Sequence, residues 1–263
     1  MKILITGSRG YIGYNLVDYL KKMEPETEII GLDPCSHPDS RSRHSNQFTI
    51  HENILDAELP LDIDIVIHLA GRTGVGDSWD PNNIKSYYES NVLASQKIFH
   101  TYSRPPYKSD IPILYATSSS VNEMKSPYAM TKAMVESIAP QTAIGMRFFT
   151  VYGGKIPRSD MFYSKALNNK VDSITNNKRD FTHVDYVCYA IHALMTLGKQ
   201  GKIYDIGMGK PQSPREFLNS QNLLTDEYIP LVQNLSESKE TKADPTEIEK
   251  ILRIYRLNHQ PHT

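Results

Sequence analysis

A glycine turn between a predicted strand and a predicted helix is the feature that most limits how this chain can fold. Residues 2–6 form an apolar run typical of a buried strand, and the segment from Thr6 to Gly13 reads Thr-Gly-Ser-Arg-Gly-Tyr-Ile-Gly. Apolar residues then recur at helical spacing from Ile12 to Leu20. Glycine permits close approach of the backbone, and the first N–H groups of a helix bind anions. This order predicts a cradle for the diphosphate of a dinucleotide, built from Gly7, Gly10, Tyr11, Ile12 and Gly13.

The segments that follow alternate between strand and helix. Further buried strands are predicted over residues 28–33, 63–70 and 111–116, and helices over residues 84–102 and 127–138. The predicted buried stripe of the first of these helices contains Ile84, Tyr88, Val92, Ser95, Phe99 and Tyr102. This alternation indicates an α/β fold with a mostly parallel, doubly wound sheet.

The last third of the chain predicts a smaller substrate-binding region. A helix over residues 190–197, a strand over 202–206 and a final helix over 244–256 are separated by polar segments. We therefore divide the chain into two parts. The nucleotide-binding domain takes residues 1–156 plus 179–206, and a small lid takes residues 157–178 plus 207–263.

Composition excludes several classes of protein. The chain has 263 residues, of which 39% are hydrophobic, and 29 basic against 30 acidic residues leave a net charge of −1. Such a chain can bury a core, and it lacks the basic excess typical of nucleic-acid or membrane-surface binding. With no apolar run of the roughly 20 residues that cross a bilayer and no signal peptide, a cytoplasmic location is expected. Cys35 and Cys188 form no CxxC pair, so neither a disulfide framework nor a metal site is predicted.

A carboxylate at the end of the second strand indicates which dinucleotide is bound. Asp33 lies where a carboxylate accepts hydrogen bonds from an adenosine ribose and repels a 2′-phosphate. NAD is therefore expected rather than NADP. Arg9, Arg41 and Arg43 leave NADP open, since each is a cation that can approach a 2′-phosphate.

A tyrosine and a lysine four residues apart indicate acid–base chemistry. Tyr128 and Lys132 share one face of the helix predicted over residues 127–138. A neighbouring ammonium and an oxidised nicotinamide both favour the phenolate, so we expect the pKa of Tyr128 to be lowered far enough for it to act as a general base. The preceding strand ends on four hydroxyl residues, 117–120, and any one of them can assist.

Taken in order, these motifs resemble the extended short-chain dehydrogenase/reductases, in particular the NAD-dependent nucleotide-sugar epimerases and dehydratases with a Rossmann fold. The resemblance covers nearly the whole chain. It includes the glycine turn, the segments 68–71 (His-Leu-Ala-Gly) and 147–153 (Arg-Phe-Phe-Thr-Val-Tyr-Gly), and the Tyr-x-x-x-Lys pair. Segments 146–153, 157–161 and 178–185 are most similar to UDP-glucuronate 4-epimerases.

The resemblance implies roles for further residues. Ser118 is implied as the catalytic hydroxyl, Tyr128 as the base and Lys132 as its electrostatic partner. Leu69, Ala70 and Gly71 are implied on the nicotinamide and ribose side of NAD, and Asn53 and Ile54 beside the adenine. Asn91 is implied in the cofactor site as support for the region of Lys132. Thr150 is implied to contact the sugar or nucleotide, Arg158 the sugar carboxylate and Arg179 the diphosphate. The family commonly forms homodimers through two helices of each subunit, here residues 84–102 and 126–138.

The resemblance implies a 4-epimerase of UDP-glucuronate or UDP-glucose type that works through a 4-keto intermediate. A 4,6-dehydratase is the nearest competing function, but dehydratases place Asp-Glu where this chain has Ser119-Ser120. The sequence also leaves open a 4-reductase, a decarboxylase and a catalytically inactive NAD(P)-sensing protein. The interval between Ser118 and Tyr128 is shorter than is usual in the family, which predicts a more open site.

Overall fold

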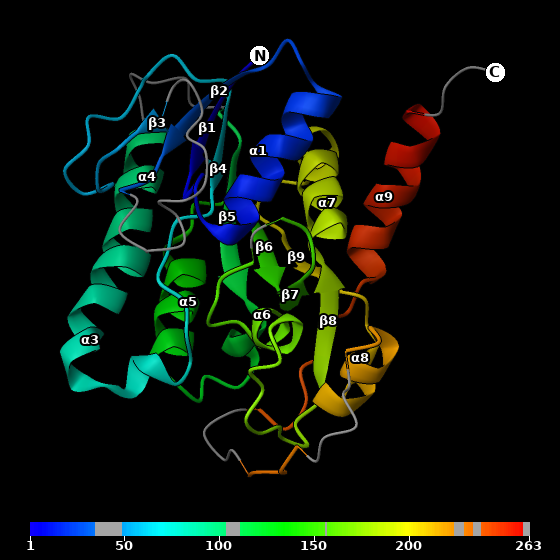
Figure 1. Cartoon of the computed structure of the whole chain (residues 1–263). Helices are drawn as coiled ribbons and strands as arrows, with labels where there is room; N and C mark the ends of the chain where they lie inside the picture. Colours follow the sequence, from blue (N-terminus) through cyan, green and yellow to red (C-terminus); the bar gives the residue numbers. More distant parts are fainter. Residues whose placement is uncertain (35–48, 104–110, 156, 224–228, 234–237, 260–263) are drawn as a thin grey trace.

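The fold is a parallel sheet covered by helices on both faces, as predicted. A computed structural model describes residues 1–34, 49–103, 111–155, 157–223, 229–233 and 238–259. The main sheet has the strand order β3-β2-β1-β4-β5-β6-β9, and all of its pairs are parallel (Figure 1). The order reverses between β1 and β4, and the carboxyl ends of strands at such a point are where α/β proteins bind ligands.

The strands of the main sheet are short, and all but β3 and β6 lie within or overlap segments predicted as strands. They are β1 (Lys2–Thr6), β2 (Glu28–Leu32), β3 (Thr49–Ile50), β4 (Ile65–His68), β5 (Ile113–Ser118), β6 (Ala143–Phe148) and β9 (Ile203–Ile206). Their side chains alternate between the two faces, as the pleat requires. In β1, Ile3 and Ile5 join one core cluster, whereas Leu4 joins the other.

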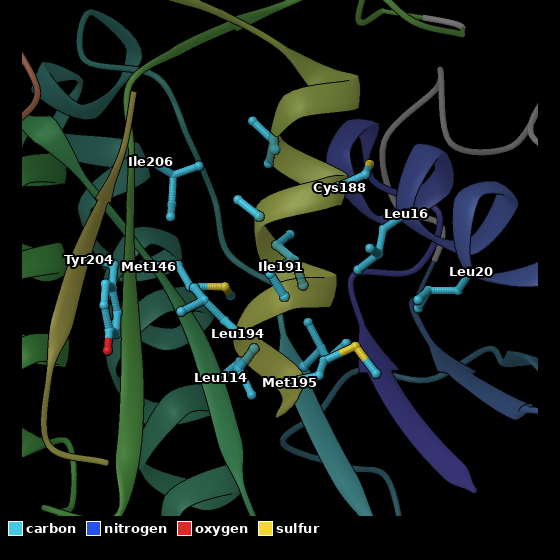
Figure 2. Close-up of a cluster of buried hydrophobic side chains, with 14 of the residues drawn as sticks. Leu16, Leu20, Leu114, Met146, Cys188, Ile191, Leu194, Met195, Tyr204 and Ile206 are labelled. Carbon is cyan, nitrogen blue, oxygen red and sulfur yellow. The ribbon is translucent and has the colours of Figure 1, made fainter. Parts of the chain in front are cut away.

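The helices divide into two layers, one on each face of the sheet. On one face lie α1 (Tyr11–Met23), α7 (Val184–Leu197) and α9 (Thr246–Asn258), and on the other lie α3 (Pro81–Tyr87), α4 (Ala94–Tyr102) and α5 (Pro127–Ile138). Figure 2 shows α7 beside α1, with Leu16, Ile191 and Leu194 pointing into the same core. Cys188 is buried there, and burial raises the pKa of its thiol to about 12, so the thiol is unreactive. No helix in the described part of the chain is long and apolar enough to cross a bilayer.

The predicted helix over residues 84–102 is interrupted, which corrects its predicted buried stripe. A π-helical turn, η2 (Tyr88–Leu93), separates α3 from α4. The π turn inserts an extra residue and so rotates the face of the preceding helix. Val92, Ser95, Phe99 and Tyr102 are buried as predicted, but Ile84 and Tyr88 are exposed, with fractions of 50% and 41%.

Tyr87 and Asn91 are buried in place of Ile84 and Tyr88. Both have polar groups that hydrogen-bond inside the protein: the Tyr87 hydroxyl donates to the carbonyl of Gly74 at 2.8 Å, and the Asn91 amide donates to Thr131 Oγ1 at 2.9 Å. The π turn thus replaces Ile84 and Tyr88 of the predicted stripe with Tyr87 and Asn91, whose polar groups bond to the loop after β4 and to α5.

A second, smaller sheet extends the molecule beyond the carboxyl ends of the main strands. It has the order β10-β8-β7, formed by β7 (Thr150–Tyr152), β8 (Arg179–His183) and β10 (Pro211–Gln212), with α6 (Phe162–Leu167) and α8 (Pro214–Ser220) nearby. The buried carboxylate of Asp180 accepts backbone N–H groups from Met208, Gly209 and Ala243 at 2.7–3.0 Å and so ties three segments together. The final helix α9 packs on α7, with Ile248, Ile251, Leu252 and Tyr255 buried as predicted. The division into two domains stays a prediction.

A buried histidine joins the two strands at which the sheet order reverses. The His68 imidazole lies 2.7 Å from Thr6 Oγ1 and 2.9 Å from Ser95 Oγ, and the side chain is 2% exposed. Burial, with a smaller contribution from the charge of Lys132, lowers the pKa of His68 to about 3. The imidazole is therefore neutral in the folded protein at neutral pH.

This pKa predicts a loss of stability in mild acid. Between pH 6.5, the ordinary pKa of histidine, and about 3, the unfolded chain binds a proton that folded His68 excludes. The unfolding free energy should therefore decrease as the pH is lowered through this window, with a contribution from His68 of about 1.4 kcal/mol per pH unit. Urea unfolding at several pH values should show His68→Gln to be less stable at neutral pH but less sensitive to acid. The same change at exposed His100 should leave the slope unaltered; equal slopes for the wild type and His68→Gln would contradict the assignment of this acid sensitivity to His68.

Candidate active site

The glycine turn brings the first helix against the ends of two strands. Gly7 has a φ of 68°, and a Cβ on it would lie 2.7 Å from the backbone nitrogen of Ala70, too close for any side chain. A Cβ on Gly13 would lie 2.1 Å from the carbonyl oxygen of Gly7. Gly10 is the N-cap of α1, and the first turn of that helix contains no acidic residue. The N–H groups of Tyr11 and Ile12 at this helix start thus suit an anion.

Of the residues predicted to contact the adenosine of NAD, Asp33 lies against the glycine turn, whereas Asn53 and Ile54 lie in the segment after β3. Asp33 is 7% exposed, and its carboxylate accepts the backbone N–H of Arg9 from the glycine turn at 3.0 Å. Asn53 uses its side-chain oxygen to accept the N–H of Leu55 at 3.0 Å, while Ile54 packs into the core. Arg41 and Arg43 lie outside the described residues.

The end of β4 meets the helix that carries the predicted tyrosine and lysine. The N–H of Ala70 donates to Thr6 Oγ1 at 3.2 Å, and the N–H of Leu69 to the carbonyl of Thr6 at 3.1 Å. A Cβ on Gly71 would lie 2.8 Å from Asn91 Oδ1 and 3.1 Å from Lys132 Nζ. Gly71, Asn91 and Lys132 therefore converge on one point.

Lys132 carries a buried ammonium. The side chain is 4% exposed, and Nζ donates to the carbonyl of Ala116 at 3.2 Å. Burial lowers the pKa of Lys132 to about 8, although the nearby carboxylate of Glu136 opposes this. The ammonium is charged at neutral pH at a cost in stability.

The Tyr128 phenol is influenced by Ser118 and by the charge of Arg158, rather than by that of Lys132. Its side chain is 8% exposed, and burial raises the pKa of the phenol, while a hydrogen bond with Ser118 and the charge of Arg158 lower it. The expected lowering of this pKa is therefore wrong for the chain's own groups, because desolvation outweighs both of them. Of the four hydroxyls in 117–120, that of Thr117 donates to Glu136 at 2.8 Å. Ser118 is the one that pairs with Tyr128.

A cavity of about 210 Å³ opens beside this pair. Ser118, Thr150 and Arg179, all predicted to touch the substrate, line it. It is also lined by Val75, Ser119, Ser120, Lys125, Ser126, Ala129, Phe149, Ser238 and Thr241. The described part of this wall thus has two cations and several hydroxyls and contains no carboxylate.

Arg158 is placed differently from the other predicted substrate residues. It does not line this cavity, although its charge reaches Tyr128. Its guanidinium bonds the carboxylate of Asp160 and the hydroxyl of Thr73.

Sequence reasoning missed two groups that support the site. Arg72 follows Gly71; its N–H donates to Asn91 Oδ1 at 2.8 Å and its guanidinium lies 4.9 Å above the Tyr87 ring. Glu136 stands one helical turn after Lys132 and binds Arg147 through two nitrogens, at 3.1 and 2.9 Å. The position of Glu136, four residues beyond Lys132, was the available signal for the second group.

Comparison with known proteins identifies the family. A model described as "NAD dependent epimerase/dehydratase family" matches residues 3–207. The chain belongs to the NAD-dependent epimerase/dehydratase family.

Relatives within this family include both epimerases and dehydratases. An uncharacterized UDP-glucose epimerase, YtcB, of Bacillus subtilis (strain 168) is 27% identical over 284 residues, which cover 92% of this chain and 84% of the relative. The dTDP-D-glucose 4,6-dehydratase of Dictyostelium discoideum is 29% identical over 256 residues, covering 78% of this chain and 58% of the relative. A solved UDP-glucuronic acid 4-epimerase from Bacillus cereus, in complex with UDP-glucuronic acid and NAD, matches with a TM-score of 0.82 and 25% identity, over 100% of this chain and 95% of that one.

The arrangement fits the cofactor of the family. Side chains at residues 7 and 13 would clash with the backbone of Leu69 and Ala70 and of Gly7 and Ser8, so these glycines let the start of α1 approach the strand ends, and the buried Lys132 ammonium lies beside Gly71. Backbone N–H groups suit the diphosphate, the Asp33 carboxylate suits a ribose hydroxyl, and Lys132 suits the second ribose. NAD is thus compatible with the residues at each end of the cradle.

The buried charge of Lys132 predicts that removing it stabilises the protein. Folding lowers the pKa of Lys132 from 10.5 to about 8. The unfolding free energy of the wild type should therefore increase as the pH is raised from about 8 to 10.5. At pH 7, which is below both pKa values, the full cost of the buried charge is present. Lys132→Met should therefore raise the unfolding free energy at pH 7 by up to about 3 kcal/mol. The measurement is chemical unfolding of the cofactor-free protein at pH 7 and pH 10.

Lys97 provides the matched control. Its Nζ donates to the carbonyls of Leu55 and Ala57 at 2.9 and 2.8 Å from a less buried position. Lys97→Met should lower stability, because two carbonyls lose a charged donor. Destabilisation of both variants would refute the claim that Lys132 is held at a cost.

Proposed function

We propose that this protein is an NAD-dependent nucleotide-sugar 4-epimerase that acts on a UDP-hexose or UDP-hexuronate. The observation that carries the proposal is the hydrogen bond between buried Tyr128 and Ser118, which lines a cavity together with other hydroxyls and Arg179, while Lys132 lies one turn further along α5 beside Gly71. Guanidinium and backbone N–H groups suit a diphosphate, and hydroxyls suit a sugar. Epimerases among the relatives and solved structures support the same reaction class.

In this proposal Tyr128 removes the proton from the sugar 4-hydroxyl. Bound NAD would supply the redox chemistry, as acceptor of the hydride from C4 and donor of the same hydride to the opposite face of the sugar. Ser118 holds the same sugar oxygen and shares its proton with Tyr128. Lys132 would hold the nearby ribose of bound NAD, and the positive nicotinamide would favour the Tyr128 phenolate that burial alone disfavours. Arg179 and the start of α5 keep the nucleotide in place while the 4-keto sugar turns.

The make-up of the cavity wall favours epimerisation over dehydration. A 4,6-dehydratase must remove a proton at C5 and protonate the leaving hydroxyl at C6, which requires an acid and a base beside the sugar. Ser119 and Ser120 stand where the dehydratases place Asp-Glu, and the described cavity wall contains no carboxylate. Incubation with UDP-glucose and UDP-glucuronate should yield their C4 epimers without loss of water or carbon dioxide. A dehydrated, reduced or decarboxylated product would contradict this assignment, and an unchanged sugar would favour an NAD-sensing role.

The role of Tyr128 is tested by Tyr128→Phe. This variant should keep its NAD, because the cradle is untouched, but kcat should fall at least about 100-fold, the usual effect of losing a general base. Bound nucleotide is measured by absorbance and turnover by separation of the two epimers.

Tyr87→Phe is the matched control for Tyr128→Phe. The Tyr87 ring packs edge-on against that of Tyr128, with centroids 6.2 Å apart, and burial raises the pKa of Tyr87 to about 12. Its hydroxyl bonds backbone carbonyls, so the variant should lose about 1 kcal/mol of stability while turnover persists. Full activity of Tyr128→Phe would exclude it as the base.

We infer that the protein is a homodimer through α3, η2 and α5. Met130, Met134 and Ile138 lie on one exposed stripe of α5, with exposed fractions of 54%, 41% and 40%. Ile84 and Tyr88 are exposed on the neighbouring helix, because the π turn rotates them outward. Together they form an apolar face on two adjacent helices, which suits a second copy of the same face.

The homodimer is tested by Met130→Glu. A buried charge on each side of a two-fold interface should convert the dimer to a monomer in light scattering at the same concentration. Met23→Glu, at an equally exposed methionine on α1, should leave the mass unchanged. A wild-type monomer would contradict the inference.

A further inference from the structure

Arg158 is fully engaged by the chain itself. Nε donates to Asp160 Oδ1 at 2.9 Å, Nη2 donates to Asp160 Oδ2, and Nη1 donates to the hydroxyl of Thr73. Each nitrogen of the guanidinium therefore already makes a hydrogen bond. The carboxylate of Asp160 takes the paired-nitrogen edge, which is the geometry that a guanidinium offers to any carboxylate.

Asp160 therefore occupies the edge of the Arg158 guanidinium that any other carboxylate would need for a paired contact. The resemblance implies that Arg158 holds the carboxylate of a uronate. For an acidic sugar, the positive charge of Arg158 is already neutralised by Asp160, and the negative charge of Asp160 repels the sugar carboxylate. A neutral hexose meets neither cost, because its hydroxymethyl group needs no cation.

The exposure of the two side chains indicates that the pair can open. The Arg158 side chain is 24% exposed, whereas that of Asp160 is 56% exposed. Asp160 can turn into solvent without leaving a buried unpaired charge, whereas Arg158 is also held by Thr73, from the loop after β4. Opening therefore moves the carboxylate and leaves the guanidinium in place.

We infer that Asp160 sets the preference of this enzyme between neutral and acidic nucleotide sugars, by competing with the substrate carboxylate for Arg158. This inference rests on the proposed function, since it concerns the sugar that the same site accepts. Asp160 acts through Arg158 and is a positioning residue. In the paired state the site favours a UDP-hexose, and a UDP-hexuronate binds only when Asp160 is displaced.

The test is the ratio of dissociation constants for UDP-glucuronate and UDP-glucose, measured by calorimetry on the NAD-loaded protein. Asp160→Asn keeps the shape of the side chain and removes its charge, so it should shift this ratio toward UDP-glucuronate by about tenfold, typical of one nearby charge. Asp160→Glu keeps the charge and should stay close to the wild type. An unchanged ratio in Asp160→Asn, or a shift toward UDP-glucose, overturns the inference.

Asp77→Asn is the matched control. Asp77 also pairs with an arginine, Arg72, at 2.7 Å, and its side chain is 53% exposed, close to that of Asp160. Because this pair is not the one implied to hold the sugar, its loss should leave the ratio of the two dissociation constants unchanged. A similar shift in both variants would mean that any lost negative charge favours the acidic sugar, and this too overturns the inference.

A double-mutant cycle separates competition from a general structural effect. In an Arg158→Met background, Asp160→Asn should no longer change the ratio, because the guanidinium for which the two carboxylates compete is absent. The same tenfold shift in that background would overturn the inference.

The same set of measurements distinguishes failure of the proposed function. A wild type that binds both sugars but makes no C4 epimer refutes the 4-epimerase, while the ratio still decides the role of Asp160. A wild type that binds neither sugar refutes both.

Discussion

The close approach of Gly7 to the end of β4 is the contact on which the rest of the site depends. A Cβ at this position would lie within 3.0 Å of three backbone atoms of Leu69 and Ala70. This contact places the N-terminus of α1 next to the point where the sheet order reverses, and so puts N–H groups suited to an anion beside the residues proposed to face the ribose and nicotinamide. Thr6 and His68, each one residue before this contact in β1 and β4, also join the two strands, with Thr6 Oγ1 2.7 Å from His68 Nδ1.

Around this contact the protein buries charges that it does not fully compensate. Lys132 and Tyr128 lie on one face of α5, and burial shifts the pKa of each toward its neutral form. A folded chain gains nothing from this arrangement, since an apolar residue in place of the lysine would stabilise it. The shifts become useful only when a cofactor brings a positive ring and a ribose to the same place. Such a cost in stability supports the cofactor-binding role proposed for Lys132.

Much of the scaffold could be predicted from the sequence, because its signals are local. The strand, glycine turn and helix at the N-terminus were confirmed, and so was the helix over Pro127–Ile138, whose proline at the first turn marks its start. The register of α3 could not be predicted. A period of 3.6 residues continues smoothly through the sequence from Ile84 to Tyr102, and nothing local marks the π turn at Tyr88–Leu93. Its cause is tertiary, since Tyr87 and Asn91 hydrogen-bond to the loop after β4.

The electrostatics of the candidate site could be predicted from the sequence even less well than the register of α3. The spacing of Tyr128 and Lys132 predicts that they share a face, but the pKa of the phenol depends on how deeply the helix is buried and on Arg158, thirty positions further along the chain. The engagement of Arg158 by Asp160 and Thr73 was likewise not predicted, since one partner is two residues away and the other comes from a distant loop. Pattern gives the residue types, whereas burial and competing partners decide what each charge can still bind.

The placement of these residues separates chemistry from selection. Ser118, Tyr128 and Lys132 lie on the end of β5 and on α5, where regular backbone hydrogen bonds fix their positions. Arg158 and Asp160, which we propose to distinguish one sugar from another, lie on loops, as does Lys125 of the cavity wall. The short path from Ser118 to α5 has only a 3-10 turn, Ser119–Asn122, and Met124 at a φ of 49°, and it leads Lys125 and Ser126 into the cavity wall. Because loops tolerate substitution at little cost to the core, this fold can change its sugar while retaining its redox chemistry.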